Sequence, residues 1–546
     1  MAPRPRVFNR LALGPVVGHT DETTTRVWIQ VFDDPGNYKL RVYGAGLFDF
    51  ASTEGPALEF RTAIAVADGL LPDTRYRYSV VRLGRVVSGT RASFRTMPGR
   101  GSMANILFCA ISCSKHVQEG AWTQFAAFVK EAKPHFILMM GDQVYVDEDT
   151  PNVFNEHFAS RPAARRAALV EKYALTWSRK VVREVLANFP CYMMWDDHDI
   201  RDGWGSVASD SPTLLARFPR GKEIYARHNA FFEDCRDVYW HFQACHNPAF
   251  VPGETPPNIV TGPPLPGERR AMPFAFRCGR IVVLVLDTRG ARDVFRPSAE
   301  LPILGADQWA FIDDVFASLD PDVEALAIVT PTPIASMDPD GQVQRLLGDR
   351  TDDVEKFKRG NAEGVLELKS GGNSEIPITI ANVHLSRITG VPLNLGTFML
   401  SKLDEARDQW SHKFSRGEQM ALLRRAGAAR RANAAPGPGR TLLFLSGDIH
   451  VGCIFDITSL NPPFKAVSLT SSGISALEDT AVVVGTFLDE KAPLGGGFTS
   501  TLRDVVRDFN FGVVQMVPTG SGAEITPAIA HEGNAWAVGV DLKDVL

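Results

Sequence analysis

The stretch Phe136–Tyr145 reads FILMMGDQVY, an apolar run that passes directly into a glycine and an aspartate. Four other apolar runs also end in acids, histidines, a cysteine or an arginine: Ile106–Ser114 (ILFCAISCS), Cys191–Asp199 (CYMMWDDHD), Ile281–Arg289 (IVVLVLDTR) and Leu442–His450 (LLFLSGDIH). A short apolar run bounded by turn residues is typical of a strand buried on both faces. Because ligands of open α/β sheets bind outside the carboxyl ends of the strands, the polar residues after these runs are expected to meet at one site.

The rest of the chain indicates two kinds of domain. Helical patterns, such as Trp122–Ala132 and Ala163–Leu186, separate the apolar runs, which predicts a sheet with helices on its faces. Residues 12–97 read instead as all-β, and the turn before Tyr76 and Tyr78 is typical of the tyrosine corner of immunoglobulin-like or fibronectin-like sandwiches. The expected organisation is a β-sandwich domain (1–97), a linker (98–105), an α/β domain (106–520) and a C-terminal extension (521–546).

Composition limits the classes of function. The 546 residues exceed one ordinary domain, and 45% of them are hydrophobic, as in a globular protein with a large core. A net charge of -5 and a pI near 6.2 argue against a nucleic-acid partner. No stretch approaches about eighteen consecutive apolar residues, and the start lacks the apolar run of a signal peptide, so no membrane span and a cytoplasmic location are expected. The seven cysteines are scattered without CxxC spacing, and most are expected to be inert core residues.

The motif Trp195-Asp196-Asp197-His198-Asp199 is the most specific of the strand-end groups. Three acids around one histidine repel one another unless a cation or solvent compensates them. With a cation present, one acid binds the metal, His198 is free to contact a phosphoryl oxygen or donate a proton to a leaving group, and Asp199 fixes the tautomer of His198. The alternative is a solvated acidic surface.

Two further motifs carry Gly-Asp at a strand end. Asp142 follows Gly141, and its two oxygens can bridge two cations, with Tyr145 three residues further on. Asp448 and His450 are two residues apart, which places both side chains on one side of an extended segment. Gly-Asp alone often makes only a turn, so these motifs gain their weight from occurring together.

Single residues at the other strand ends have two interpretations each. Cys113 either supplies a thiolate to a metal or is a buried core thiol. Arg289 either clamps a phosphate bidentately or pairs with Asp287. Weaker candidates are His384, the pair Asp408 and His412, the basic helix around Arg424–Arg431, a loop at 247–270 and an insertion or lid at 337–375. The chain has no GxSxG, GxxxxGK[ST] or HExxH motif, which argues against the chemistries that depend on them.

Taken in order, the motifs Gly-Asp-Gln-Val-Tyr, Trp-Asp-Asp-His-Asp and Ser-Gly-Asp-Ile-His resemble those of the PhoD-like (alkaline phosphatase D) family of metallophosphoesterases. The Leu-Asp-Thr-Arg segment, the Leu-Gly-x-x-Gln-Trp segment at 304–309 and the preceding β-sandwich also fit, so that the resemblance covers roughly residues 12–480. It implies a four-layer α/β/β/α sandwich as the catalytic domain, preceded by the small all-β domain, and a centre of two or more metal ions, iron plus calcium, with manganese or zinc as alternatives.

The resemblance also implies residue roles. Cys113, Asp142 and Tyr145 bind the iron-like ion, with Asp142 bridging. Asp448 and His450 complete the metal site, Asp197 contributes to it, and His198 contacts the substrate. Asp202 stands where family members commonly have an asparagine that binds the second cation, so the identity of that cation is open.

The activity that follows is hydrolysis of phosphodiesters, phosphomonoesters or both, by attack of a metal-bound hydroxide on a small phosphate ester. Two alternatives remain at this point: a non-catalytic binding protein with a vestigial metal site, and a metal-dependent hydrolase of esters other than phosphates. The sequence does not predict the oligomeric state.

Overall fold

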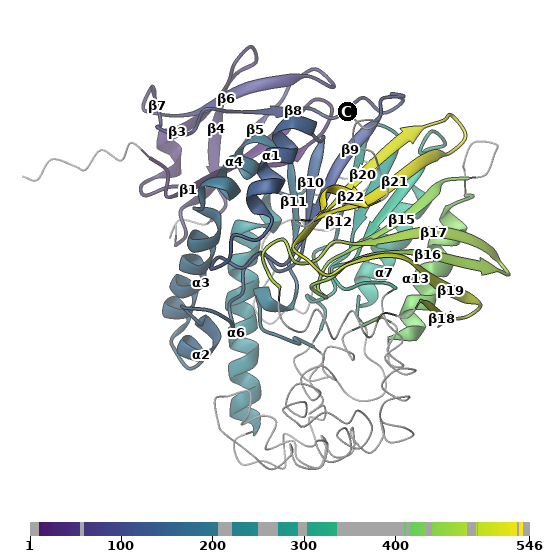
Figure 1. The fold of residues 1–546 in the computed structure, drawn as a ribbon. Helices are drawn as coiled ribbons and strands as arrows, with labels where there is room; N and C mark the ends of the chain where they lie inside the picture. Colours follow the sequence, from purple (N-terminus) through teal and green to yellow (C-terminus); the bar gives the residue numbers. More distant parts are fainter. Residues whose placement is uncertain are drawn as a thin grey trace, which may run out of the picture.

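The chain forms three β-sheets with helices packed against them (Figure 1). The computed structural model describes residues 10–54, 59–205, 221–248, 271–292, 303–335, 409–410, 415–432, 439–477, 488, 490–531 and 534–538. Residues 247–248 belong to this part, whereas the rest of the loop expected at 247–270, the insertion expected at 337–375, and His384, Asp408 and His412 lie outside it.

The N-terminal sheet contains eight antiparallel strands in the order β1-β2-β5-β4-β3-β6-β7, with β8 paired to β6. Its strands are β1 (Leu13–Thr20), β2 (Thr25–Gln30), β3 (Tyr38–Val42), β4 (Gly46–Ser52), β5 (Thr62–Ala67), β6 (Arg75–Arg82), β7 (Arg85–Val86) and β8 (Ala92–Arg95). The hydroxyl of Tyr76 accepts a hydrogen bond of 2.9 Å from the backbone N–H of Leu71, five residues earlier in the chain. The hydroxyl of Tyr78 instead donates to the carbonyl of Ala187, which ties this sheet to the helices beyond it.

The second sheet has the order β11-β10-β9-β20-β21-β22. Its strands are β9 (Ile106–Ile111), β10 (Phe136–Met140), β11 (Cys191–Met194), β20 (Asn510–Pro518), β21 (Ala523–His531) and β22 (Asn534–Val538). The first three are parallel and buried along their whole length, as the apolar runs predict. The chain returns after residue 500 to add β20 beside β9, and β21 and β22 continue the sheet beyond residue 520.

The third sheet has the order β12-β13-β14-β15-β17-β16-β19-β18. Its strands are β12 (Phe274–Cys278), β13 (Ile281–Val285), β14 (Ala325–Val329), β15 (Thr441–Ser446), β16 (Gly452–Leu460), β17 (Pro463–Thr470), β18 (Lys491–Gly495) and β19 (Phe498–Val506). The central strands β13, β14, β15 and β17 are parallel, and the strands at both edges are antiparallel. The carboxyl ends of β13 and β15 therefore point the same way.

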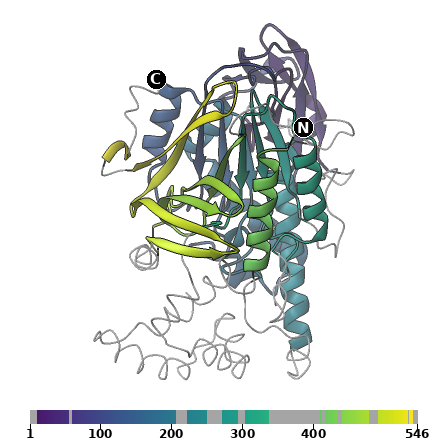
Figure 2. The ribbon, with the colours of Figure 1, turned by 90° about the vertical axis from the view of Figure 1, so that its right-hand side faces the viewer.

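Alternation along β13 shows how the layers meet. Ile281, Val283 and Val285 belong to the large core that also contains β9, β10 and β11, so this face of the third sheet packs toward the second sheet. Val282 and Leu284 belong to a separate core with α7 (Ala306–Ala317) and α13 (Arg416–Ala429). Figure 2 shows these two helices side by side against the third sheet. The fold is therefore α/β, as the strand and helix pattern predicts.

Other helices cover the second sheet and connect it to the N-terminal sheet. They are α1 (Trp122–Ala132), α2 (Val153–His157), α3 (Pro162–Trp177), α4 (Lys180–Asn188) and α6 (Gly221–Phe242). The single helix expected over Ala163–Leu186 is in fact two, because the backbone of Arg179 leaves the helical conformation between α3 and α4. Within the part of the chain that the structure describes, no helix is both long and apolar enough to cross a membrane.

Candidate metal centre

The polar residues that end the buried strands converge as the strand arrangement predicts. Cys113 follows β9, Asp142 follows β10, Asp196 and Asp197 follow β11, and His450 follows β15. The two parallel segments, β9–β11 and β13–β15, thus present their carboxyl ends to one place although they belong to different sheets.

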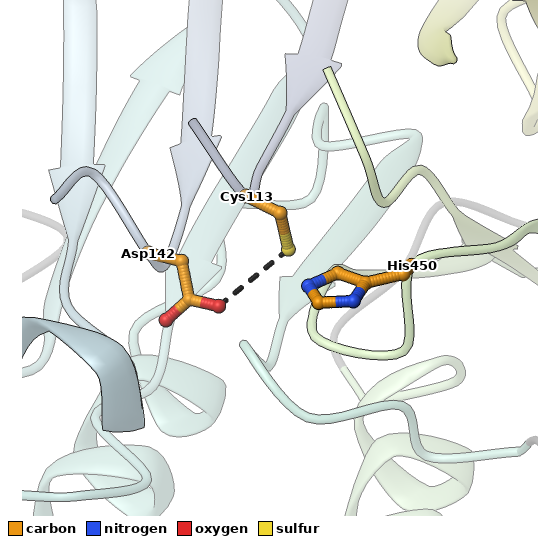
Figure 3. Close-up of side chains that lie close together, drawn as sticks. All are labelled: Cys113, Asp142 and His450. Atoms are coloured by element: carbon orange, nitrogen blue, oxygen red, sulfur yellow. Dashed lines mark hydrogen bonds between the residues drawn. The ribbon is translucent and has the colours of Figure 1, made fainter. Parts of the chain in front are cut away.

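Cys113, Asp142 and His450 form the first cluster of potential ligands (Figure 3). One ligand atom from each lies within 4.8 Å of the others, and all three side chains are buried. The thiol of Cys113 lies 3.6 Å from Oδ2 of Asp142. The hydroxyl of Tyr145 donates to the same Oδ2 at 3.3 Å and lies 2.9 Å from Nε2 of His450. The structure therefore gathers a thiol, a carboxylate, a phenol and an imidazole around one point.

An unusual backbone conformation aims these side chains. Cys113, Asp142, Asp448 and His450 have φ values of 62°, 53°, 74° and 54°, all in the left-handed region. Residues other than glycine rarely adopt this region, and it costs of order 1–3 kcal/mol each, so it is found mainly where the surrounding structure holds it. Ser472 helps to hold this backbone conformation. Its hydroxyl contacts the Cys113 thiol and accepts a hydrogen bond from the backbone N–H of His450.

The glycines of both Gly-Asp motifs allow the strand ends to approach closely. A Cβ atom on Gly447 would lie 2.3 Å from the hydroxyl of Ser112, and one on Gly141 would lie 2.5 Å from the Cβ of Asp196. Gly141 also has a φ of 107°. Gly-Asp is therefore more than a turn signal in this chain, because any side chain at the glycine would push the ligand-bearing strand ends apart.

A second cluster contains carboxylates only. Asp142, Asp196 and Asp197 are buried and place one oxygen each within 4.8 Å of the others. Asp142 thus belongs to both clusters, which is the arrangement of a residue that bridges two cations. Oδ1 of Asp197 is buried and has no hydrogen-bond partner among the described residues; its nearest cation is Arg289, 3.6 Å away.

Arg289 is fully buried behind the carboxylate cluster, with a side chain 0% exposed. Its guanidinium donates to Asp196 and to the carbonyl of Trp204. Asp287, the alternative partner, binds backbone N–H groups instead, including that of Arg289 itself at 2.9 Å. The guanidinium therefore contacts Asp196 and not Asp287, and a contact of Arg289 with phosphate stays a prediction.

The third cluster contains Asp197, His198 and Asp202, again with ligand atoms within 4.8 Å of one another. The carboxylate that orients His198 is Asp147 and not Asp199. Oδ1 of Asp147 lies 2.8 Å from Nδ1 of His198, and its other oxygen accepts the backbone N–H of Asp202. Asp199 cannot take this place because neighbouring residues of the short helical turn η2 (Asp197–Asp199) do not face each other.

Asp199 has a different position, directed into the protein. Its carboxylate accepts the backbone N–H groups of Asp196 at 3.0 Å and Gln143 at 3.3 Å, and the side-chain amide of Gln243 at 2.9 Å. These bonds hold the turn after β11 against the turn after β10. The contacts of Asp199 are thus those of a residue that holds the loops in place.

Asp448 lies at the margin of the centre. Asp448 belongs to none of the three ligand clusters, and its side chain is 13% exposed. Its Oδ2 accepts a hydrogen bond of 3.1 Å from the side chain of Gln409, and its Oδ1 lies 4.0 Å from Arg289. Of the sequence-derived candidates, the structure therefore brings together Cys113, Asp142, Tyr145, Asp197, His198, Asp202 and His450, and leaves Asp448, Asp199 and Arg289 around them.

Burial and crowding shift the titration of these groups. Burial raises the pKa of Asp142 well above its ordinary value, and the neighbouring carboxyls of Asp197 and Asp196 raise it further, against the opposing effect of His198. Burial also raises the pKa of Cys113 and of Tyr145. Burial alone would lower the pKa of His198, but the carboxylates of Asp147, Asp197 and Asp142 together raise it well above its ordinary value. Ionising these buried acids without a counter-charge therefore costs free energy. A bound cation reduces this cost.

Sequence reasoning missed Asp147 and gave no metal role to Asp196. Asp147 stands in the acidic run Asp147-Glu148-Asp149, two residues after Tyr145, and this run is the signal that could have pointed to it. Asp196 was visible as one of three acids, but its pairing with Arg289 joins residues 93 positions apart and has no sequence signature.

The chain is similar to a known protein family in sequence and to a solved structure in fold. The profile of a family described as PhoD-like phosphatase matches residues 108–491. A solved structure titled "Structure of PhoD" superposes with a TM-score of 0.54 at 13% identity, covering 98% of this chain and 94% of that one. A purple acid phosphatase from yellow lupin (Lupinus luteus) seeds superposes with a TM-score of 0.46 at 11% identity, covering 96% and 72%. No curated protein sequence matches the chain.

Proposed function

Because the chain belongs to the PhoD-like phosphatase family, we propose that it hydrolyses phosphodiesters, phosphomonoesters or both, at a centre of two or more metal ions. The observation that carries this proposal is the position of Asp142, whose carboxylate is shared between the Cys113–His450 cluster and the Asp196–Asp197 cluster. A carboxylate shared in this way is what a two-cation phosphoesterase needs, since two ions a few ångströms apart stabilise the attacking and leaving oxygens together.

The residues present fit metal ions. Cys113, Tyr145 and His450 supply sulfur, phenol oxygen and imidazole nitrogen, a set that suits a transition metal such as ferric iron. Asp196, Asp197 and Asp202 supply only oxygen, which suits calcium and also manganese. Asp202 has a carboxylate where family members commonly have the amide of an asparagine. It therefore adds one negative charge to the ligands available for the second cation. Zinc at the first cluster is the alternative that metal analysis distinguishes.

The other residues of the site have separate roles in the proposed reaction. Metal ions held by these residues would supply a water molecule of lowered pKa, available as hydroxide near neutral pH. Asp147 accepts a hydrogen bond from Nδ1–H of His198 and so orients the ring with Nε2 free to face the substrate, where it donates a proton or a hydrogen bond to the phosphoryl group. Arg289 is a positioning residue, since it holds Asp196 in the cluster. Asp199 holds the loops that carry Asp142 and His198.

The layer arrangement of the catalytic domain and the class of the N-terminal domain are part of the same proposal. The two cores on either side of β13, with α7 and α13 outside one sheet and helices outside the other, support the four-layer α/β/β/α sandwich of the family. The antiparallel β1–β8 sheet and the Leu71–Tyr76 bond support an immunoglobulin-like or fibronectin-like domain before it.

Hydrolysis of bis-p-nitrophenyl phosphate and p-nitrophenyl phosphate tests the proposed function directly. We expect the purified protein to hydrolyse at least one of them, to lose this activity after treatment with a chelator, and to regain it when iron and calcium, or manganese, are restored. The ratio of the two rates measures diester against monoester preference. Full activity after complete metal removal, checked by elemental analysis, would contradict the proposal.

Replacing the histidine and its partner separates two roles. We expect His198→Ala to lower kcat by about a hundredfold, which is the lower range for loss of a general acid. Asp147→Asn should cost about ten- to a hundredfold, because an amide orients His198 less well. Asp147→Glu is the conservative variant that should recover part of this loss. If Asp147→Asn had the activity of the wild type, the assignment of Asp147 as the positioning residue would be wrong.

A further inference from the structure

A cavity of about 230 Å³ lies between the N-terminal sheet and the junction of α3 and α4. Its walls come from the start of the described chain through β1, from the loop before β8, and from Ser178 and Arg183 near the start of α4. None of the residues that line it belongs to the candidate metal centre. The cavity is therefore a separate feature that the proposed activity does not use.

The charge of this cavity is positive and uncompensated. Arg10 and Arg183 line it, and no acidic residue does. Within the described part of the chain neither guanidinium pairs with a carboxylate, and the Arg10 guanidinium lies over the ring of Phe32, 5.7 Å from its centre. Arg179, which follows the lining residue Ser178, is by contrast paired with Glu119. Two guanidinium groups at one cavity without an acid between them favour an anionic ligand.

Two serine hydroxyls add to this preference. Ser88, Thr90 and Ser178 line the same cavity; the Thr90 hydroxyl donates to the carbonyl of Val87, whereas the hydroxyls of Ser88 and Ser178 have no hydrogen-bond partner among the described residues. Helix α4 begins two residues after Ser178, and no side chain caps its first turn. The amino end of a helix carries a partial positive charge, which favours an anion nearby, although Lys180, Val181 and Val182 of this first turn do not themselves line the cavity.

We propose that this cavity, the Arg10–Arg183 cavity, binds a phosphate group, either as inorganic phosphate or as the phosphate of a small ester. Guanidinium groups bind phosphate oxygens bidentately, and hydroxyl donors can serve the remaining oxygens of a tetrahedral anion. Leu11, Leu13 and Phe32 form an apolar wall that can accept a short carbon chain beside the phosphate. A planar carboxylate would use fewer of these donors.

Titration calorimetry of the full-length protein tests the cavity with three probes: inorganic phosphate, methylphosphonate and acetate. Methylphosphonate represents a phosphate ester because its P–C bond resists ester hydrolysis. The variants are Arg183→Ala and Arg10→Ala with Arg183→Ala, and the control is Arg85→Ala, an exposed arginine of the same sheet that does not line the cavity. Phosphate is also an expected product at the metal centre, so the comparison is made between variants, with turnover measured in each.

We expect the affinity of this cavity for phosphate to fall by about tenfold or more in Arg183→Ala, since each charge-assisted hydrogen bond contributes about 1.5–3 kcal/mol. The site should be lost in the double variant and be unchanged in Arg85→Ala, while turnover stays at the wild-type level in all three. Tighter binding of methylphosphonate than of inorganic phosphate would indicate an ester as the ligand, and the reverse would indicate free phosphate. Equal binding by wild type and double variant, or stronger binding of acetate than of either phosphate probe, would overturn the proposal.

Discussion

Replacement of Asp142 by asparagine is expected to lower kcat/KM by about a thousandfold or more while the protein stays folded. Asp142 is fully buried and belongs to two ligand clusters, so an amide removes one negative charge from both. The metal contribution to transition-state stabilisation amounts to several kcal/mol, and each 1.36 kcal/mol corresponds to about tenfold in rate. The metal content of the purified protein should fall as well, which elemental analysis measures independently of activity.

The control for this variant is Asp49→Asn. Asp49 is an exposed aspartate on the N-terminal sheet whose side chain is 78% exposed and pairs with Lys39. Its replacement should change neither activity nor metal content. Circular dichroism and a thermal melt show whether each variant is folded. An Asp142→Asn protein that is folded, binds metal as before and turns over within a few-fold of wild type would exclude the bridging role.

Replacement of Arg289 by methionine is expected to destabilise the protein by about 3–5 kcal/mol, the cost of breaking a buried ion pair by removing one partner. Methionine keeps most of the volume of the side chain, but it leaves the carboxylate of Asp196, which is 0% exposed, without its guanidinium. The measurement is the midpoint of denaturant unfolding in the presence of chelator, so that bound metal does not mask the loss.

A double variant and a surface pair test this explanation. Adding Asp196→Asn to Arg289→Met should restore part of the stability, because the unpaired charge is then absent. Arg503→Met breaks the Arg503–Asp456 pair, whose side chains are 41% and 27% exposed, and should cost no more than about 1 kcal/mol. An equal loss in the buried and the exposed variants would show that charge burial is not the cause.

The five apolar strands and the family could be predicted from the sequence alone. Ile106, Phe136, Cys191, Ile281 and Leu442 each begin an apolar run that the structure shows as a buried strand. Strand identity is a local property of such runs, and the strand-end rule then places their polar residues together. The resemblance to the PhoD-like phosphatases is confirmed by the profile match over residues 108–491. Residue types at strand ends were therefore sufficient for the family and the α/β class.

The partners within the site could not be predicted in the same way. Sequence adjacency suggested Asp199 as the partner of His198, and the structure places Asp147 there, 51 residues away. Adjacency likewise suggested Asp287 as the partner of Arg289, and the guanidinium lies on Asp196. Both errors come from treating neighbours in the chain as neighbours in space, although consecutive residues of a turn point in different directions.

The local sequence specifies which segments are buried strands and which chemical groups stand at their ends. The tertiary structure alone decided how those groups face one another. The left-handed backbone of Cys113, Asp142 and His450, and the close approach of Gly447 to Ser112, exist because strands from two sheets meet at one place. The physical reason is that a local pattern sets hydrophobicity and backbone preference, whereas the direction of a side chain at a strand end depends on contacts with residues far away in the chain.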